Sequence, residues 1–215
     1  MNFAIIAGGN GYLKAPIDFG EGWTSIAITY VYTKYPHADI IMDMHNEEII
    51  NEHHKLCVSL ARQNDIPYYC LDKYESVPTS VRYPIEDVID FFQTDYMNSS
   101  VDYAIAFAIF NGAKKIALYG MSLSALDEYF FQKASIEAWL WRAIGMGIEV
   151  EIGDPEHTVL FHTVRSDGKK VSTRPSNNMY GYLHPQKLKG WPGHEDIEYN
   201  FPNHEKVECE VCDNR

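Results

Sequence analysis

The sequence predicts an α/β fold with a mainly parallel sheet flanked by helices, followed by a loop-rich C-terminal extension. The chain opens with a short apolar strand, residues 3–7, that runs directly into the glycines of residues 8–11. Strand-like apolar segments then alternate with amphipathic helical segments as far as residue 152. This alternation is typical of βαβ units, whose right-handed crossovers place neighbouring strands parallel. The periodicity fades afterwards, so we expect one domain over residues 1–154 and an extension over residues 155–215.

The first third of the chain is expected to supply three strands. Residues 3–7, 38–43 and 66–71 are short apolar runs bounded by polar or turn residues, which is typical of buried strands. Between the first two strands, residues 23–35 are predicted to form a helix.

A helix is expected to follow the second strand. Asn46 is a good N-cap, and acidic residues come directly after it, where the helix dipole favours negative charge. Apolar residues then recur at helical spacing on one face as far as Ala61. His53 and His54 lie in the middle of this helix, where we expect them to pack or to face solvent.

The next part of the chain continues the alternation. Pro84 suits the first turn of a helix, and residues 99–102, Ser-Ser-Val-Asp, form a capping-box pattern that opens another. A strand from Lys115 stops at Gly120. A second capping pattern begins a long aromatic helix, and residues 148–152 form the last strand of the core.

Composition limits the classes of function. The 18 basic and 30 acidic residues give a formal charge of −12, which disfavours broad binding to nucleic acid but allows a small nucleotide in a local pocket. No apolar run reaches the length of a membrane span, so no membrane partner is expected. Four unevenly spaced cysteines do not suit a disulfide scaffold, which favours a cytoplasmic protein, in the host cytoplasm if the chain is viral.

Polar and glycine clusters follow several of the predicted strands or open a helix. In a parallel sheet the ligand lies beyond the carboxyl ends of the strands, and a helix N-terminus attracts phosphate. Glycines there let backbone N–H groups approach a ligand closely. We therefore expect a nucleotide site. Its candidate binding residues are Gly9, Asn10, Gly11, Ser99, Ser100, Gly120 and Ser122.

Asp43 and His45 follow the second strand with one residue between them. The pair could bind a metal or act as an acid and a base, and it could also simply cap the helix that begins near Asn46. Cys209 and Cys212 form half of a zinc pattern without a defined second half, so we assign no metal site. Incidental cysteines in an exposed tail are the alternative.

Three stretches together resemble a known family: Gly9-Asn10-Gly11, residues 98–116 and Leu118-Tyr119-Gly120-Met121-Ser122. They look like the Rossmann-like superfamily of bacterial lipooligosaccharide sialyltransferases and 6-hydroxymethylpterin diphosphokinase-like proteins, of which small members are common in bacteriophages. The resemblance covers residues 1–152. It implies a Rossmann-like fold in which the glycine turn and the serine-led helix embrace the cytidine nucleotide of a sugar donor.

The chain departs from this family at two places. Ser122 stands where the family usually has an aspartate, and residues 128–133 contain no counterpart of the catalytic histidine of the sialyltransferases. The family's mechanism is therefore not carried over. The general base would be Asp43, His45, Glu128 or a residue of the extension such as His157.

The expected function is a glycosyltransferase-type enzyme that moves a sugar from a nucleotide donor to a hydroxyl acceptor, with the donor as substrate and no cofactor assigned. The acceptor is open. Hydroxymethylated DNA is one candidate if the chain is viral, although the charge disfavours it, and an oligomer is compatible with the sequence. The alternatives are a non-catalytic protein that sequesters a nucleotide signal and a diphosphokinase-type transferase. The aromatic-rich extension is expected to cover the Gly9 turn as a lid.

Overall fold

The computed structural model describes residues 1–123, 126–155, 158, 160, 163–164 and 170–171. The side chains of Asn10, 126–131, 163–164 and 170–171 are not among those described. The expected lid over residues 155–215 therefore lies almost wholly outside the described residues, as do His157, Cys209 and Cys212. Within the described part, none of the helices is both long and apolar enough to cross a bilayer.

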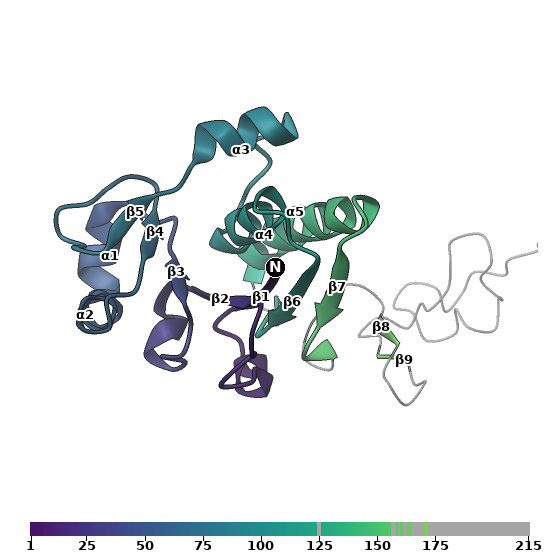
Figure 1. Ribbon diagram of the computed structural model, residues 1–215, viewed down its shortest axis with the longest axis horizontal. Coiled ribbons are helices and arrows are strands. Elements are labelled where there is room, and N and C mark those ends of the chain that lie inside the picture. Colours follow the sequence, from purple (N-terminus) through teal and green to yellow (C-terminus); the bar gives the residue numbers. More distant parts are fainter. Residues whose placement is uncertain (124–125, 156–157, 159, 161–162, 165–169, 172–215) are drawn as a thin grey trace, which may run out of the picture. The chain divides into compact units, whose positions relative to one another are not determined.

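Seven parallel strands form the sheet, in the order β5-β4-β3-β2-β1-β6-β7 (Figure 1). The strand order reverses at β1, which pairs with β2 on one side and with β6 on the other. This observation confirms the expected α/β, Rossmann-like fold. The strands are β1 (Asn2–Ile6), β2 (Trp23–Ile28), β3 (Ile40–Met42), β4 (Tyr68–Cys70), β5 (Ser80–Arg82), β6 (Lys115–Tyr119) and β7 (Glu149–Ile152).

The prediction of a helix over residues 23–35 is wrong. Trp23–Ile28 is strand β2, inserted between β1 and β3, and Thr29–Thr33 is a short 3-10 helix, η2. Ile26 and Ile28 face one hydrophobic core and Ala27 faces the other, which is the two-residue alternation of a strand. Strand β5 was not anticipated either, because its three residues carry too short a pattern.

Helices cover both faces of the sheet (Figure 1). One core packs β1, β2 and β6 against α3, α4 and α5, and the other packs the opposite side of the strands against η2, α1 and α2. The helical elements are η1 (Asn10–Lys14), η2, α1 (Glu47–His53), α2 (Lys55–Gln63), α3 (Ile85–Phe92), α4 (Ser100–Phe110) and α5 (Leu126–Gly145). Two short strands, β8 (Thr163–Val164) and β9 (Lys170–Val171), pair antiparallel.

Strand β1 shows why the sheet holds together between these two layers. Phe3 and Ile5 enter one core, while Ala4 and Ile6 enter the other, and all four side chains are buried. Strands that are buried on both faces are continuously apolar, as expected for a parallel sheet. The strand ends are consequently where this part of the sheet can present polar groups.

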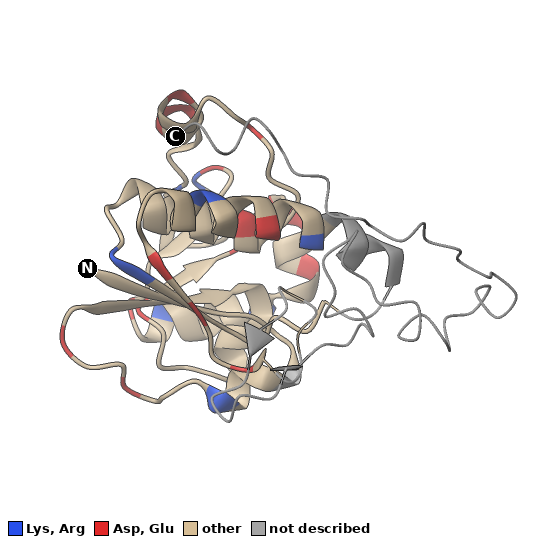
Figure 2. Ribbon diagram, turned by 90° about the vertical axis from the view of Figure 1, so that its right-hand side faces the viewer, with Lys and Arg blue, Asp and Glu red and all other residues tan. Residues whose placement is uncertain are grey.

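Charged side chains are interspersed over the described surface. In the view of Figure 2, acidic and basic residues are both scattered along the described helices and loops. The net charge of −12 disfavours the broad phosphate contacts on which duplex binding depends.

Candidate active site

A cavity of about 640 Å³ lies at the carboxyl edge of the sheet. It is bordered by the residues that follow β1, β2, β3 and β6 and by the first turn of α4, so it lies where the strand order reverses. In open parallel sheets this is the usual position of the ligand. Its lining residues include Gly8, Gly9, Thr29, Tyr30, Met44, His45, Asn98, Ser99, Ser100, Gly120 and Ser122.

Two glycines let the ends of β1 and β6 come together at the floor of this cavity. The Ala7 N–H donates to the Tyr119 carbonyl at 2.9 Å, and the Gly9 N–H donates to the Gly120 carbonyl at 3.0 Å. Gly120 has a φ of +72°, and a side chain there would collide with the Ala7 carbonyl oxygen. A Cβ on Gly9 would lie 2.6 Å from the Gly120 carbonyl oxygen.

These contacts change the interpretation of Gly9. Its N–H group was expected to approach a phosphate, but it is already engaged by β6. Gly9 and Gly120 therefore shape the cavity by close packing, and Ser122 borders the cavity beside Gly9. Gly11 packs against the buried Asp154 instead of lining the cavity.

The N-terminus of α4 opens onto the cavity. Ser99 is the N-cap, and its side-chain oxygen accepts a hydrogen bond from the Asp102 N–H. Ser100 and Val101, the first two helical residues, both border the cavity. The first N–H groups of a helix have no partners within the helix and carry a partial positive charge, which suits an anion. The Ser99 cap expected from the sequence is confirmed, and the Asp102 side chain accepts from the Asn98 N–H.

Ser100 also ties α4 to the sheet. Its hydroxyl oxygen accepts a hydrogen bond of 3.1 Å from the Met44 N–H, directly after β3. Two of the predicted clusters, the serines of α4 and the Asp43–His45 segment, are thereby fixed next to each other.

Asp102 is buried beneath the same helix start. One carboxylate oxygen accepts hydrogen bonds from the Asn98 N–H at 2.7 Å and the Ser135 hydroxyl at 2.8 Å. The other oxygen has no hydrogen-bond partner among the described residues. Burial raises the pKa of Asp102 to about 6, although the hydrogen bonds from Ser135 and Asn98 act in the opposite direction.

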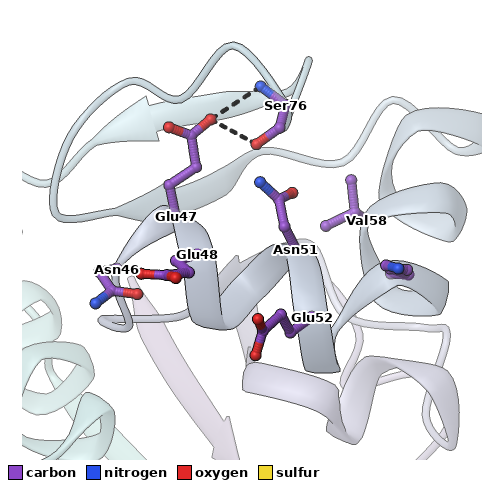
Figure 3. A pocket seen from close by; sticks show the side chains of 8 residues that line it. Asn46, Glu47, Glu48, Asn51, Glu52, Val58 and Ser76 are labelled. Atoms are coloured by element: carbon purple, nitrogen blue, oxygen red, sulfur yellow. Dashed lines mark hydrogen bonds between the residues drawn. The ribbon is translucent and has the colours of Figure 1, made fainter.

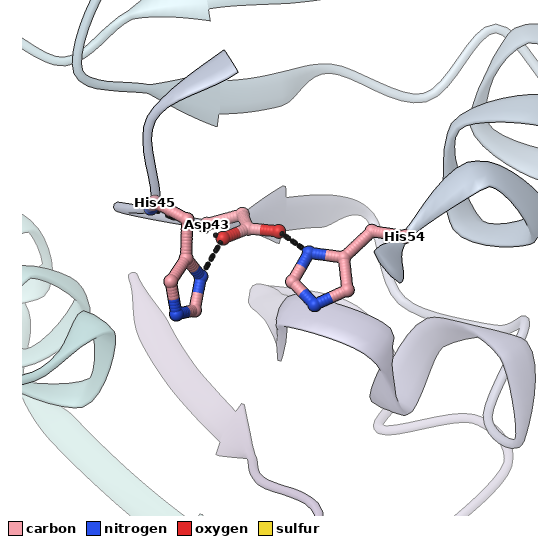
Figure 4. Close-up of side chains that lie close together, drawn as sticks. All are labelled: Asp43, His45 and His54. Carbon is pink, nitrogen blue, oxygen red and sulfur yellow. Dashed lines mark hydrogen bonds and ion pairs between the residues drawn. The ribbon is translucent and has the colours of Figure 1, made fainter. Parts of the chain in front are cut away.

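Asp43 is the centre of a buried hydrogen-bond network (Figure 4). Its Oδ1 accepts from His45 Nδ1 at 2.6 Å and from the His45 backbone N–H at 3.2 Å. Its Oδ2 accepts from His54 Nδ1 at 2.6 Å and from the Tyr68 hydroxyl at 2.8 Å. An ionised carboxylate only accepts hydrogen bonds, so both imidazoles carry their proton on Nδ1 when they are neutral.

The network keeps Asp43 ionised. Burial by itself would raise the pKa of Asp43, but the hydrogen bonds from His45, His54 and Tyr68 outweigh it and hold that pKa well below its ordinary value. A charged carboxylate behind a histidine fixes the ring and makes its second nitrogen, Nε2, more basic. The His45 side chain is 44% exposed and borders the cavity, whereas the His54 side chain is 10% exposed.

The structure excludes one of the three interpretations of Asp43 and His45, that of a helix cap. The N-cap of α1 is Asn46, whose side-chain oxygen accepts from the Ile49 N–H at 2.9 Å, so the pair does not serve as the cap. An acid–base pair and a metal pair both remain compatible with the geometry. Among the described residues, Asp43, His45 and His54 each place one ligand atom within 4.8 Å of the others.

His54 corrects a prediction. The expected single helix is broken into α1 and α2, and His54 lies at the break with φ −114° and ψ 18°. The break turns its ring toward Asp43, although residues 43 and 54 are separated by a whole helix in the sequence. No local pattern indicates this contact, because it depends on how α1 folds back against β3.

No family model matches the chain, and no curated protein matches it either. Solved structures of the sialyltransferase CstII do match. The complex of the Campylobacter jejuni enzyme with CMP-3FNeuAc has 15% identity and a TM-score of 0.49, covering 72% of this chain and 81% of that one. Its complex with cytidine-5'-monophosphate has 16% identity and a TM-score of 0.46, covering 87% and 97% of the two chains. A complex of CST-II with a trisaccharide acceptor and CMP has 16% identity and a TM-score of 0.44, covering 72% and 82%.

The cavity thus brings together most of the residues that the sequence singled out. Gly9, His45, Gly120 and Ser122 border it together with the two serines of α4, while Asp43 lies behind His45. The backbone of Glu128 lies in α5, but its side chain, like that of Asn10, is outside the described set.

The sequence did not indicate that residues following β2 line the cavity. Thr29 and Tyr30 follow β2 and border the cavity, and they fell within the segment that was expected to be helical. Thr29 has a φ of 49°, which is unusual for a β-branched residue. The Tyr30 hydroxyl approaches so closely that a Cβ on Gly8 would lie 2.6 Å from it.

A second hollow lies beside α1 and is lined mainly by acidic and amide side chains (Figure 3). Glu47 accepts hydrogen bonds there from the Ser76 N–H at 3.1 Å and the Ser76 hydroxyl at 2.6 Å. Its acidic lining disfavours a phosphate, so the cavity at the carboxyl edge is the better candidate for a nucleotide.

Proposed function

We propose that this chain is a glycosyltransferase-type enzyme that transfers a sugar from a nucleotide donor to a hydroxyl acceptor. One observation supports it most: a single cavity is bordered both by the N-terminus of α4 and by His45, which Asp43 holds. Transfer to a hydroxyl requires a base at the acceptor and stabilisation of the departing phosphate. The class of reaction follows the resemblance found in the sequence.

The donor would bind with its phosphate at the start of α4. The described residues that line the cavity include no lysine or arginine, so backbone N–H groups and the helix dipole would carry the phosphate charge. A volume of about 640 Å³ is within the range of small-molecule sites. Such a site suits an acidic protein, because it attracts phosphate locally without a basic surface.

His45 would be the general base. Its Nε2 takes the proton of the acceptor hydroxyl, and the acceptor oxygen forms a bond to the anomeric carbon of the sugar. The bond from that carbon to the phosphate oxygen breaks, and its electron pair leaves with the nucleotide. Asp43 would stabilise the imidazolium that forms, as a buried carboxylate does behind a catalytic histidine.

Turnover of CMP- and UDP-sugars, measured as nucleotide release with and without acceptor alcohols, tests this proposal. We expect His45→Ala and Asp43→Asn to lower kcat by about 10²–10⁴-fold, the usual contribution of general-base catalysis. His53→Ala is the matched control, because the His53 side chain is 69% exposed and lies beside Glu52 on the surface of α1. Unchanged turnover in both site variants would remove the two residues from the mechanism.

A non-catalytic protein that sequesters a nucleotide is the second candidate. The serine at position 122, where the resemblance leads one to expect an acid, favours binding without turnover. Either candidate predicts that a nucleotide at 100 times its dissociation constant adds about 2.7 kcal/mol to the free energy of unfolding. Mass spectrometry of nucleotide sugar recovered after hours with the protein separates them, since only the sequestering protein returns it intact with all acceptors present.

A further inference from the structure

We propose that Asp43, His45 and His54 form a zinc site, and that a Zn²⁺ ion bound there blocks the cavity's base. The binding site is independent of the reaction, whereas the inhibitory consequence rests on the function proposed above.

The ligand set is one that zinc uses. Zinc in proteins is bound by imidazole nitrogens and carboxylate oxygens, and sites with three protein ligands keep a fourth position open. Each oxygen of Asp43 already lies 2.6 Å from the Nδ1 atom of a different histidine, and one ligand atom of each residue lies within 4.8 Å of the others. The three side chains are therefore gathered before any ion arrives (Figure 4).

The surroundings of Asp43 resemble the outer shell of a metal site. Tyr68 donates its hydroxyl to Oδ2 at 2.8 Å, and the backbone N–H of His45 donates to Oδ1. Such outer hydrogen bonds orient a ligating carboxylate and are part of its affinity for the ion. The carboxylate and two neutral imidazoles also carry a net charge of −1 in a buried place, which a divalent cation would compensate.

The site is reached from the cavity. Asp43 is fully buried and His54 nearly so, but the His45 side chain is 44% exposed and borders the cavity. An ion would therefore approach past His45, and the fourth coordination position would face the space where the acceptor binds.

Occupancy would switch off the base. When zinc takes Nδ1 of a neutral imidazole, the proton formerly on Nδ1 is lost to water and another is taken up on Nε2, so the charge of the ring does not change. Nε2 of His45 then carries a proton and can no longer accept one from the acceptor hydroxyl. Zinc would inhibit transfer without displacing the nucleotide from the start of α4.

Zinc binding is best measured in the full chain carrying Cys209→Ser and Cys212→Ser, because these thiols could compete for the ion. Titration against a chromophoric chelator should give one tight equivalent. His54→Gln and Asp43→Asn should each weaken binding by at least ~100-fold, and Tyr68→Phe by about 10–100-fold, the range for outer-shell partners. His53→Gln, one residue from His54 but exposed, should bind as the parent does.

Because His54 and Asp43 are buried, His45→Gln provides a loss-of-ligand variant at a partly exposed position, and circular dichroism checks the fold of each variant. Co²⁺ bound to the parent should show the visible absorption of a tetrahedral ion, and this absorption should be absent in His45→Gln. No tight equivalent in the parent, or equal affinity in the His45, His54 and His53 variants, would overturn the site. These measurements need no sugar donor, so they stand even if the chain proves not to be a transferase.

Where turnover is found, it should fall with zinc occupancy in the parent. Activity that persists at full occupancy would overturn the inhibitory role.

Discussion

Two buried carboxylates beside the cavity have opposite electrostatic environments. Asp43 receives hydrogen bonds from two imidazoles and a phenol, so its charge is compensated. Within the described part of the chain, Asp102 receives hydrogen bonds on only one oxygen, and burial raises its pKa to about 6. The same side-chain type thus supplies a permanent negative charge in one place and a group that titrates near neutrality in the other.

Asp102 should make the stability of the protein depend on pH. Its folded-state pKa of about 6 lies above the ordinary value of 3.8, so its contribution is fully present below pH 3.8 and is lost as the pH rises through 6. The loss is at most about 3 kcal/mol, since each pKa unit corresponds to about 1.4 kcal/mol. Asp102→Asn should therefore gain stability relative to the parent between pH 4.5 and 7.5.

Urea unfolding of both proteins at the two pH values measures this difference. The side-chain amide of the Asp102→Asn variant is neutral at both pH values, and it meets the same place without a hydrogen-bond partner at each of them. Its effect on the free energy of unfolding is therefore the same at both pH values and cancels in the comparison. Equal pH slopes in the two proteins would contradict the assignment.

Among the elements, α4 combines structural and binding roles. Its residues from Val101 to Ile109 are buried except for the partly buried Tyr103, which anchors the helix in the core. Its first turn is held by the Ser99 cap and by the bond from the Met44 N–H to Ser100. A rigid helix start of this kind provides preorganised donors for an anion, without the entropic cost of ordering long basic side chains.

Substitutions at Ser99 should separate capping from anion binding. Ser99→Ala should lower the free energy of unfolding by about 1 kcal/mol, because the Asp102 N–H loses its cap. Ser99→Asp should keep the cap but place a negative charge beside the cavity, and it should weaken CMP and UMP binding more than ~10-fold by repulsion.

Urea unfolding and isothermal titration calorimetry measure the two effects at Ser99. If Ser99→Asp binds nucleotide as well as the parent does, the phosphate does not lie at the start of α4.

For the whole molecule, the junction of β1 and β6 decides where the cavity lies. The sheet order reverses there, and the segments that follow the two parallel strands approach to a distance that only glycine permits. Helices from both layers pack around this junction, so the cavity floor is continuous with the two cores. The position of the site is therefore a property of the strand order and not of one motif.

A pair of glycine substitutions tests this junction. Gly20 and Gly120 both have positive φ, +81° and +72°, so an alanine at either should cost about 1–2 kcal/mol of backbone strain. At Gly20 nothing lies within 4 Å of the added Cβ, whereas at Gly120 the Ala7 carbonyl is in the way. Gly120→Ala should therefore destabilise by a further ~1–3 kcal/mol of overpacking.

Thermal and urea unfolding compare the stabilities of the two alanine variants, and a nucleotide titration compares their affinities. Gly20→Ala should keep its affinity for nucleotide, and Gly120→Ala should lose it. Equal stabilities of the two variants would mean that the strand ends are not in close contact.

The sequence by itself determined the α/β class, the helix start at Ser99 and the polar residues that follow the strands, because these depend on local periodicity and capping. It misassigned residues 23–28, although Ile26 and Ile28 have the two-residue spacing of a strand, and the pairing with β1 and β3 shows that the segment is one. The tertiary structure alone placed Thr29 on the cavity wall and brought His54 and Tyr68 to Asp43. His54 is 11 positions from Asp43 in the sequence, and Tyr68 is 25 positions from it. Such contacts arise from strand order and helix packing, which local sequence patterns do not encode.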